Sequence, residues 1–260
     1  MRTLLRWIRR ALLIALAALL LWQLWLFGHV VYWNFENPRE TSFMRMRLAE
    51  LQAAADARAE AKGRAESKAA AEARGRVEGR ERPPAPVRLR HQWVPYERIS
   101  VHLKRAIIVA EDDKFIDHEG FDWEAIQRAF EQNLKQGRVV RGGSTISQQL
   151  AKNLFLSDSR TPWRKLQEAA ITLMLEQTMD KRRILEIYLN VIEWGNGVFG
   201  AEAAARHYFG VPASQLMPEQ AARLAAMVPN PRFYDRNRGT PWLARYSTII
   251  LSRMPRAQVP

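Results

Sequence analysis

The longest hydrophobic run of the chain lies near its N-terminus, at residues 11–33. Only Gln23 and His29 interrupt it with strongly polar side chains. About 20 apolar residues span the hydrocarbon core of a bilayer as a helix, so the run is long enough to cross a membrane. Aromatic residues crowd its C-terminal half, as expected where a helix meets the membrane–water interface. The pattern therefore predicts a transmembrane anchor at residues 11–33.

The residues on either side of this run predict its orientation. Residues 1–10 form a basic tail with four arginines, and a cluster of positive charge marks the cytoplasmic side of a span. Everything after Trp33 is then expected on the outer side of the membrane. A cleaved secretory signal would also start with basic and apolar residues, but it needs a pattern of small residues for cleavage. Residues 27–33 lack that pattern, so we expect an uncleaved single-pass anchor.

Residues 34–92 are predicted to form a charged spacer. Alanine, arginine and glutamate dominate residues 44–82, and aromatic residues are missing there. Alanine and alternating charge favour a helix, yet no apolar stripe would pack it against a core. We interpret the segment as solvated and partly helical, ended by the proline-rich residues 83–86. A partner-binding helix is the alternative interpretation.

The remaining residues, 93–260, show helical periodicity without a run of period-two alternation. Ser100 is a plausible N-cap for a helix that ends at Glu111. Thr161-Pro162 and Asp180 are cap signals for two further helices, and Pro218 is expected to open another that closes before Pro229. Glycines at 195, 197 and 200 indicate a loop. Helices joined by short loops, with no sheet, predict one all-α domain.

Composition narrows the possible partners. The 260 residues, 47% of them hydrophobic, suffice for one domain outside the membrane, and the absence of cysteine is compatible with a periplasmic protein that needs no disulfide. The formal net charge of +13 suits nucleic acid, an anionic membrane surface or a phosphate-bearing substrate. A location outside the cell membrane argues against nucleic acid.

Glu111 is the first candidate for chemistry. Ile107 and Ile108 precede it by four and three residues, so its carboxylate is expected at the rim of an apolar helix face. Partial desolvation there would raise its pKa toward the range useful for a general base. A solvated acid at a helix end is the structural alternative. Asp112 and Asp113 are interpreted as solvated or supporting acids, and His118 as a structural histidine.

A second candidate site begins at Gly142-Gly143, where the backbone can turn sharply and approach a ligand. Ser144 is expected to cap the helix that follows. Ser144, Gln148 and Lys152 are spaced by four residues, which would place a hydroxyl, an amide and a cation on one face near the free amides of the helix N-terminus. This arrangement indicates an anion site, and an ordinary amphipathic surface helix is the alternative.

Two further groups of residues stand out. Arg160, Arg164 and Lys165 concentrate positive charge, and Glu168 lies within helical pairing distance of the last two. Between the two candidate sites, apolar residues alternate with basic ones. These apolar residues are Phe121, Trp123, Ile126, Phe130 and Leu134. A core helix is the simplest interpretation of this segment, and a segment at the membrane interface is the other.

Three blocks in this order, at residues 111–122, 141–153 and 164–168, resemble the peptidoglycan glycosyltransferases, in particular their monofunctional membrane-anchored branch. The resemblance covers residues 93–231. It implies a two-lobed, lysozyme-like, all-α fold and an enzyme of the inner membrane with its catalytic domain in the periplasm. It also implies that the segment around Trp123 is a mobile jaw that dips into the membrane.

The activity that the resemblance implies is polymerisation of glycan strands from lipid II. Glu111 would take the proton of the acceptor's 4-hydroxyl, and Glu168 would be the second essential carboxylate. Inversion at the donor's anomeric carbon would release polyprenyl diphosphate. The residues implied in substrate binding are Ser144, Thr145, Gln148, Lys152, Arg160, Arg164 and Lys165. A divalent cation, magnesium or manganese, is also implied, with no organic cofactor.

Two other functions remain as alternatives. A lysozyme-like hydrolase or lytic transglycosylase also uses a key glutamate in a helical fold, but does not need the cations at residues 152–165. A non-catalytic anchored scaffold would use the spacer to recruit cell-wall synthesis or division proteins. The sequence contains no S-x-x-K or K-T-G element, so we expect no transpeptidase domain.

Overall fold

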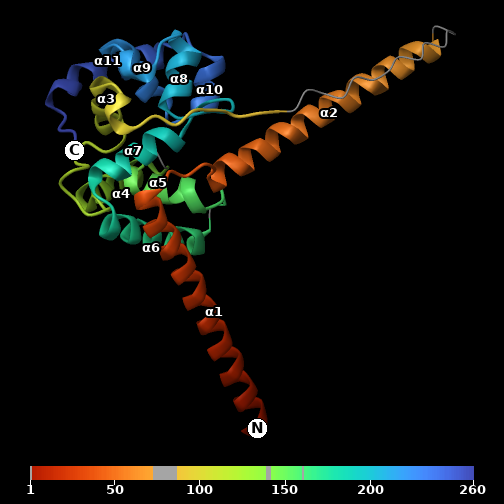
Figure 1. Cartoon of the computed structure of the whole chain (residues 1–260), viewed down its shortest axis with the longest axis vertical. Helices are drawn as coiled ribbons and strands as arrows, with labels where there is room; N and C mark the ends of the chain where they lie inside the picture. The colour runs from red at the N-terminus through yellow and green to blue at the C-terminus, as the bar shows by residue number, and fades with distance from the viewer. Residues whose placement is uncertain (1, 73–86, 139–141, 160) are drawn as a thin grey trace.

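The computed structural model describes residues 2–72, 87–138, 142–159 and 161–260. Helices dominate these residues, which confirms the predicted all-α class (Figure 1). The helices are α1 (Arg2–Phe35), α2 (Ser42–Glu72), α3 (Val101–Glu111), α4 (Trp123–Gln136), α5 (Ile146–Phe155), α6 (Pro162–Thr178), α7 (Lys181–Val191), α8 (Ala201–Phe209), α9 (Pro218–Met227), α10 (Pro231–Arg236) and α11 (Pro241–Arg253). One-turn 3-10 helices lie at Tyr96–Arg98, Ala213–Gln215 and Met254–Arg256.

The predicted helix starts are confirmed by their caps. The side chains of Ser100, Thr161 and Asp180 each accept a hydrogen bond from a backbone amide in the first turn of α3, α6 and α7. These bonds satisfy amides that have no partner within the helix. Glu111 is the last residue of α3, and α9 begins at Pro218 as expected.

A small sheet corrects the prediction that this domain contains none. The strands β1 (Arg90–His91), β2 (Glu193–Gly195) and β3 (Val198–Phe199) are arranged in the order β1-β3-β2. Strand β3 pairs in parallel with β1 and antiparallel with β2. Gly195 and Gly197 therefore belong to a hairpin, whereas Gly200 is the N-cap of α8. Gly197 has a φ of +72°, a backbone conformation that residues with a side chain rarely adopt. Strands of two or three residues are too short to show alternation in the sequence.

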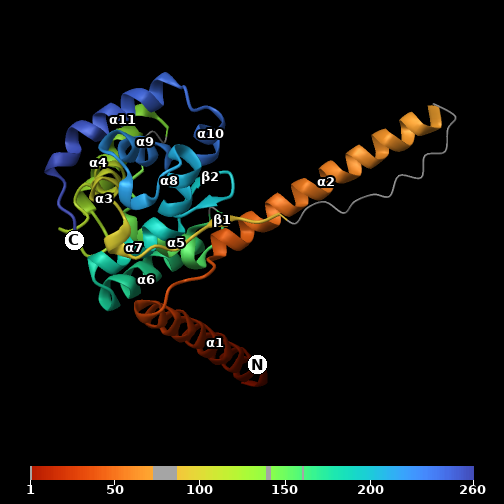
Figure 2. The same ribbon diagram turned by 45° about the horizontal axis from the view of Figure 1, so that its top comes forward.

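The helices of residues 93–260, the body of the protein, form two groups (Figures 1 and 2). In one group, α3 and α11 pack on α9, with α8, α10 and the sheet beside them. In the other group, α5 packs on α6 and α7. Fully buried side chains such as Leu103 and Ile107 in α3, and Leu150 in α5, fill the core. This arrangement places the end of α3 next to the start of α5.

The upper part of α1 packs against the second group, next to α6 (Figure 1). Leu26 and Val30 are buried there. The Arg183 guanidinium donates hydrogen bonds to the carbonyl oxygens of Trp33, at 2.8 Å from Nη2, and Glu36, at 2.9 Å. These bonds satisfy carbonyls at the C-terminal end of the helix, where a cation is also favoured by the helix dipole. The predicted anchor is thus part of a longer helix that is fixed to the body.

The first turns of α2 also pack on the body, a contact that the sequence did not indicate. Met44 and Arg47 are buried, and Arg47 Nε lies 3.0 Å from Glu193 Oε1 in β2. From Gln52 to residue 65, nearly all side chains are exposed, in agreement with the predicted solvated spacer. Residues 73–86, which include the proline-rich end of that spacer, lie outside the described residues.

Helix α4 presents much of its apolar side-chain surface to the outside. Trp123, Phe130 and Leu134 are 71%, 66% and 73% exposed, so the core interpretation is wrong for these three. Ala129 is the buried position of the helix. Apolar residues that do not pack on the body suit an interfacial segment, and the membrane-dipping jaw stays a prediction.

Candidate active site

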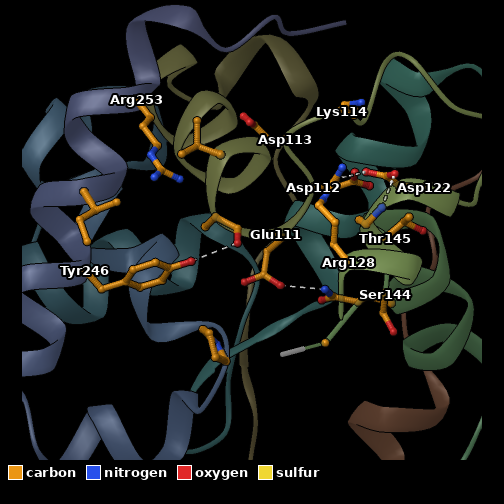
Figure 3. Close-up of a pocket in the computed structure, with 18 residues that line it drawn as sticks. Glu111, Asp112, Asp113, Lys114, Asp122, Arg128, Ser144, Thr145, Tyr246 and Arg253 are labelled. Carbon is orange, nitrogen blue, oxygen red and sulfur yellow. Dashed lines mark hydrogen bonds and ion pairs between the residues drawn. The ribbon is translucent and has the colours of Figure 1, made fainter. Parts of the chain in front are cut away.

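A cleft of about 760 Å³ lies where the two groups of helices meet (Figure 3). Residues 109–114 at the end of α3 form its floor together with residues 142–145 and Gln149. Asp122 and Arg128 line it from the side of α4, and α11 contributes further residues. The cleft therefore joins the two blocks that the sequence singled out, around residues 111 and 144.

Glu111 lies in this cleft with one oxygen bound and one free. Its Oε2 accepts a hydrogen bond of 2.7 Å from Gln149 Nε2. Its Oε1 is enclosed and has no partner among the described residues. Burial raises the pKa of Glu111 above its ordinary value, and the nearby Asp112 charge adds to this effect, while the Gln149 hydrogen bond opposes it. A carboxylate with a raised pKa and an unbound oxygen is equipped to accept a proton.

A chain of side-chain hydrogen bonds holds this carboxylate in place. Gln149 in α5 donates to Glu111 and accepts a bond of 2.8 Å from the Tyr188 hydroxyl in α7. Tyr188 is fully buried, so the chain is anchored in the core. The orientation of the Gln149 amide is thereby fixed, because its NH₂ group can only donate and its oxygen can only accept.

Asp112 ties the end of α3 to the start of α5. Its Oδ2 accepts a bond of 3.0 Å from the backbone amide of Ile146, and its Oδ1 lies 2.9 Å from His118 Nε2. Asp112 is buried, so it is a supporting acid rather than a solvated one. This contact also agrees with the predicted structural role of His118. The carboxylate of Asp112 therefore links the sequence block at residues 111–122 to the block at residues 141–153.

The predicted cap of α5 is corrected by one residue. Thr145 is the N-cap and forms a capping box with Gln148, whose side chain accepts from the Thr145 amide at 3.0 Å. Gln148 is consequently buried, and the polar face predicted for Ser144, Gln148 and Lys152 does not form. Ser144 precedes the helix and lines the cleft as an exposed residue, and Thr145 lines it as well.

The predicted cations lie away from the lining of this cleft. Lys152 Nζ pairs with Asp158 at 2.8 Å, one turn of α5 beyond Gln149. In α6, Arg164 Nη1 lies 2.6 Å from Glu168 Oε2, and Lys165 pairs with the other oxygen. Glu168 is buried, so the intrahelical ion pairs that were the simpler account of these residues are present. Arg160 lies outside the described residues.

Comparison with known proteins adds a family to this geometry. A sequence model of the family described as "Transglycosylase" matches residues 81–255. The chain belongs to this transglycosylase family. A protein of Nitrosospira multiformis named "Biosynthetic peptidoglycan transglycosylase" is 58% identical over 98% of both chains. Proteins with the same name from Azoarcus sp. and Dechloromonas aromatica are 58% identical over the full length of both chains. The predicted lysozyme-like fold is that of this family.

The described residues do not present a metal site built by the protein alone. They contain no group of three or more histidine, aspartate or glutamate side chains that could hold an ion. Glu168, the predicted second carboxylate, pairs with Arg164 through one oxygen and with Lys165 through the other. The divalent cation remains a prediction for this transglycosylase.

Sequence reasoning missed several residues that line the transglycosylase cleft, among them Gln149, Tyr246 and Arg253. The predicted substrate-binding glutamine is the neighbouring Gln148. The one sequence signal for Gln149 is its position three residues after Ile146, beside the apolar stripe of α5. Tyr246 and Arg253 of α11 also line the cleft. They lie more than 130 residues after Glu111, and no local pattern connects them to it.

Proposed function

We propose that this chain polymerises the glycan strands of peptidoglycan from lipid II. The observation that carries the proposal is the Glu111 carboxylate, enclosed in the cleft, with a raised pKa and one free oxygen. Membership of the transglycosylase family and the names of its relatives support the same reaction. The membrane-associated substrate fits a chain whose N-terminal helix is long and apolar enough to cross a membrane.

The proposed reaction is one inverting transfer. The 4-hydroxyl oxygen of the acceptor's N-acetylglucosamine forms a bond to the anomeric carbon of the donor's N-acetylmuramic acid. Its proton passes to Glu111. The bond from that carbon to the diphosphate oxygen breaks, and its electron pair leaves with the polyprenyl diphosphate. A positioned base contributes roughly 10²- to 10⁴-fold to the rate of such a step.

The leaving diphosphate is assigned to the side of α5 and α6. Lys152 follows Gln149 by three residues, so the cation and the partner of Glu111 lie on successive turns of α5. Arg164 and Lys165 add charge from α6, where Glu168 orients both. Cations placed where negative charge develops stabilise the transition state more than the ground state. We also propose Arg160 for this role, on sequence grounds alone.

The packing of helix α1 on the body explains how lipid-linked substrates reach α5 and α6. Helix α1 has 34 residues, or about 51 Å at 1.5 Å per residue, against about 30 Å for the hydrocarbon core. Its upper turns can therefore pack on α6 while the rest crosses the bilayer, and Gln23 bonds to Gln167 in α6 at 3.1 Å. Trp163, Leu166 and Leu173 expose an apolar face of α6. We propose that this face rests on the outer surface of the inner membrane, with the N-terminus in the cytoplasm.

A reconstituted assay tests the proposal. Detergent-solubilised full-length protein is incubated with labelled lipid II, and the products are separated by size before and after muramidase treatment. Muramidase-sensitive polymer from the wild type, and none from Glu111→Gln, is the expected result. Release of soluble fragments from mature cell wall, without polymer, would identify a hydrolase instead. Absence of both activities would leave only the scaffold function.

A further inference from the structure

One face of α11 continues the cleft beyond the catalytic residues. Trp242, Tyr246, Ile249 and Arg253 recur at intervals of four, three and four residues, so they share one side of the helix. The last three line the cleft, and Figure 3 shows Tyr246 and Arg253 directed into it. A different face of α11, with Leu243 and Ile250, packs into the core. Trp242 and Ile249 remain 39% and 38% exposed.

Aromatic rings extend this face away from Glu111. The rings of Tyr246 and Trp242 have centroids 4.9 Å apart, and Trp242 stacks on Tyr234 of α10 at 5.3 Å with an interplanar angle of 9°. The Tyr246 hydroxyl donates a bond of 3.2 Å to the carbonyl of Ala110, the residue before Glu111. The row of rings thus begins beside the catalytic base and leads out over α10.

Arg253 adds a positive charge at the other end of this face. No hydrogen bond or ion pair to its guanidinium is found among the described residues. The other two cations that line the cleft differ, because Lys114 pairs with Glu124 and Arg128 pairs with Asp122 and Glu124. A guanidinium without an acidic partner in the described part of the chain is suited to a carboxylate on a ligand.

The position of α11 indicates which ligand this is. Figure 1 shows α11 on the side of the body opposite to α1, with α6 on the same side as α1. Under the proposed function, the diphosphates of both substrates lie toward α6 and the membrane. The disaccharide of a single lipid II molecule would end near Glu111. A growing glycan strand is longer and would continue beyond Glu111, away from the membrane. The face of α11 lies along that continuation.

We propose that Tyr234, Trp242, Tyr246, Ile249 and Arg253 form a binding track for the growing glycan strand when its lipid-linked end is the donor. The aromatic rings contact the apolar faces of successive sugars, and Arg253 pairs with a carboxylate of the peptide stems. The track retains the strand between couplings. This inference rests on the proposed function and assigns to it a site outside the catalytic residues.

The test uses full-length protein and measures two quantities for each variant. These are the mean length of the glycan strands and the rate of the first coupling. Trp242→Ala, Trp242→Phe and Arg253→Ala are assayed with labelled lipid II, and products are resolved at equal substrate consumption. The first coupling is measured as formation of the lipid-linked tetrasaccharide. Trp242→Ala and Arg253→Ala should shorten the mean strand by about two- to tenfold relative to the first coupling, the range expected for an aromatic contact or a solvent-exposed ion pair. Trp242→Phe should recover part of the length.

Arg256→Ala is the matched control, because Arg256 is exposed and does not line the cleft. It should give strands of wild-type length. Strands of wild-type length from Trp242→Ala and Arg253→Ala would overturn the track, as would equal shortening by Arg256→Ala. An equal loss of tetrasaccharide formation and elongation would place these residues in the catalytic site instead. If the wild type makes no polymer, the proposed function fails first. Circular dichroism checks that each variant is folded.

Discussion

Gln149 Nε2 lies 2.7 Å from Glu111 Oε2, and this bond is made between residues 38 positions apart in the chain. The bond opposes the effect of burial on Glu111, because a hydrogen bond to the ionised carboxylate favours the ionised form. Gln149 therefore limits how far burial raises the pKa of Glu111, the proposed base. Burial alone would hold more of Glu111 in the protonated form, which cannot accept a proton.

Gln149→Ala should shift the acidic limb of the pH–rate profile to higher pH. Without this hydrogen bond nothing from Gln149 opposes the effect of burial, so the pKa of Glu111 should rise further. The measurement is the initial rate of polymerisation across pH. Gln148→Ala is the matched control, since it removes the capping box of α5 and should lower stability by about 0.5–2 kcal/mol without moving the limb. An unshifted limb in Gln149→Ala would contradict the assigned role.

Glu111→Gln should keep the fold and lower the rate of polymerisation by at least ~10²-fold, the contribution of a general base. The amide has nearly the same shape, so Gln149 can still donate to its oxygen. Initial rates with labelled lipid II, together with circular dichroism, test this expectation. A folded variant with a near-normal rate would exclude Glu111 from the proton transfer.

Glu111→Gln should also gain stability relative to the wild type as the pH rises above 4.5, the ordinary pKa of glutamate. The pKa of Glu111 is raised in the folded protein above its ordinary value of 4.5. Well below pH 4.5, Glu111 is protonated in both the folded and the unfolded chain, so its ionisation does not change the free energy of unfolding. As the pH rises through the window up to the folded pKa, the unfolded chain ionises first and the wild type loses stability. The excess free energy of unfolding of Glu111→Gln should grow across this window. Urea unfolding below and above it measures the difference, and a constant difference would refute the raised pKa.

Arg164→Ala should weaken both the fold and the use of donor. It leaves the buried Glu168 with Lys165 alone, and a charged hydrogen bond of this kind is worth roughly 1.5–3 kcal/mol of unfolding free energy. Arg164→Lys should recover only part of either loss, because the planar donor fork is missing. Arg64→Ala is the matched control: Arg64 pairs with Glu60 at the same spacing, but the two side chains are 80% and 68% exposed. Its effect on stability should be about 0–1 kcal/mol.

The spacer and the base of α2 should respond differently to change. Deletion of residues 53–80 should leave activity on detergent-solubilised substrate largely intact, since the described side chains there are mostly solvated. Arg47→Ala should lower the free energy of unfolding by about 3–5 kcal/mol, because it leaves the buried Glu193 without its cation. Urea unfolding and polymer yield measure the two effects. A loss of activity in a folded deletion variant would show that the spacer takes part in catalysis.

The sequence by itself determined the features that depend on neighbouring residues. The apolar run of α1, and the starts of α3, α6 and α7, follow from local hydrophobicity and from caps such as Ser100 and Asp180. The helical class follows from the same periodicity. The three blocks carried the resemblance that the family match confirms. None of these signals needs contacts between distant parts of the chain.

Tertiary structure decided which side chains face one another. Two adjacent glutamines of α5 differ only in direction: Gln148 turns back to the cap at Thr145, and Gln149 turns to Glu111. The capping box between Thr145 and Gln148 is a local sequence pattern and accounts for Gln148. No local pattern accounts for Gln149, whose contacts with Glu111 of α3 and Tyr188 of α7 depend on how α5 packs. Packing likewise brings Tyr246 to the residue before Glu111 across 136 positions. Helix periodicity fixes the spacing of side chains along one element, whereas the contacts between elements depend on how their faces pack.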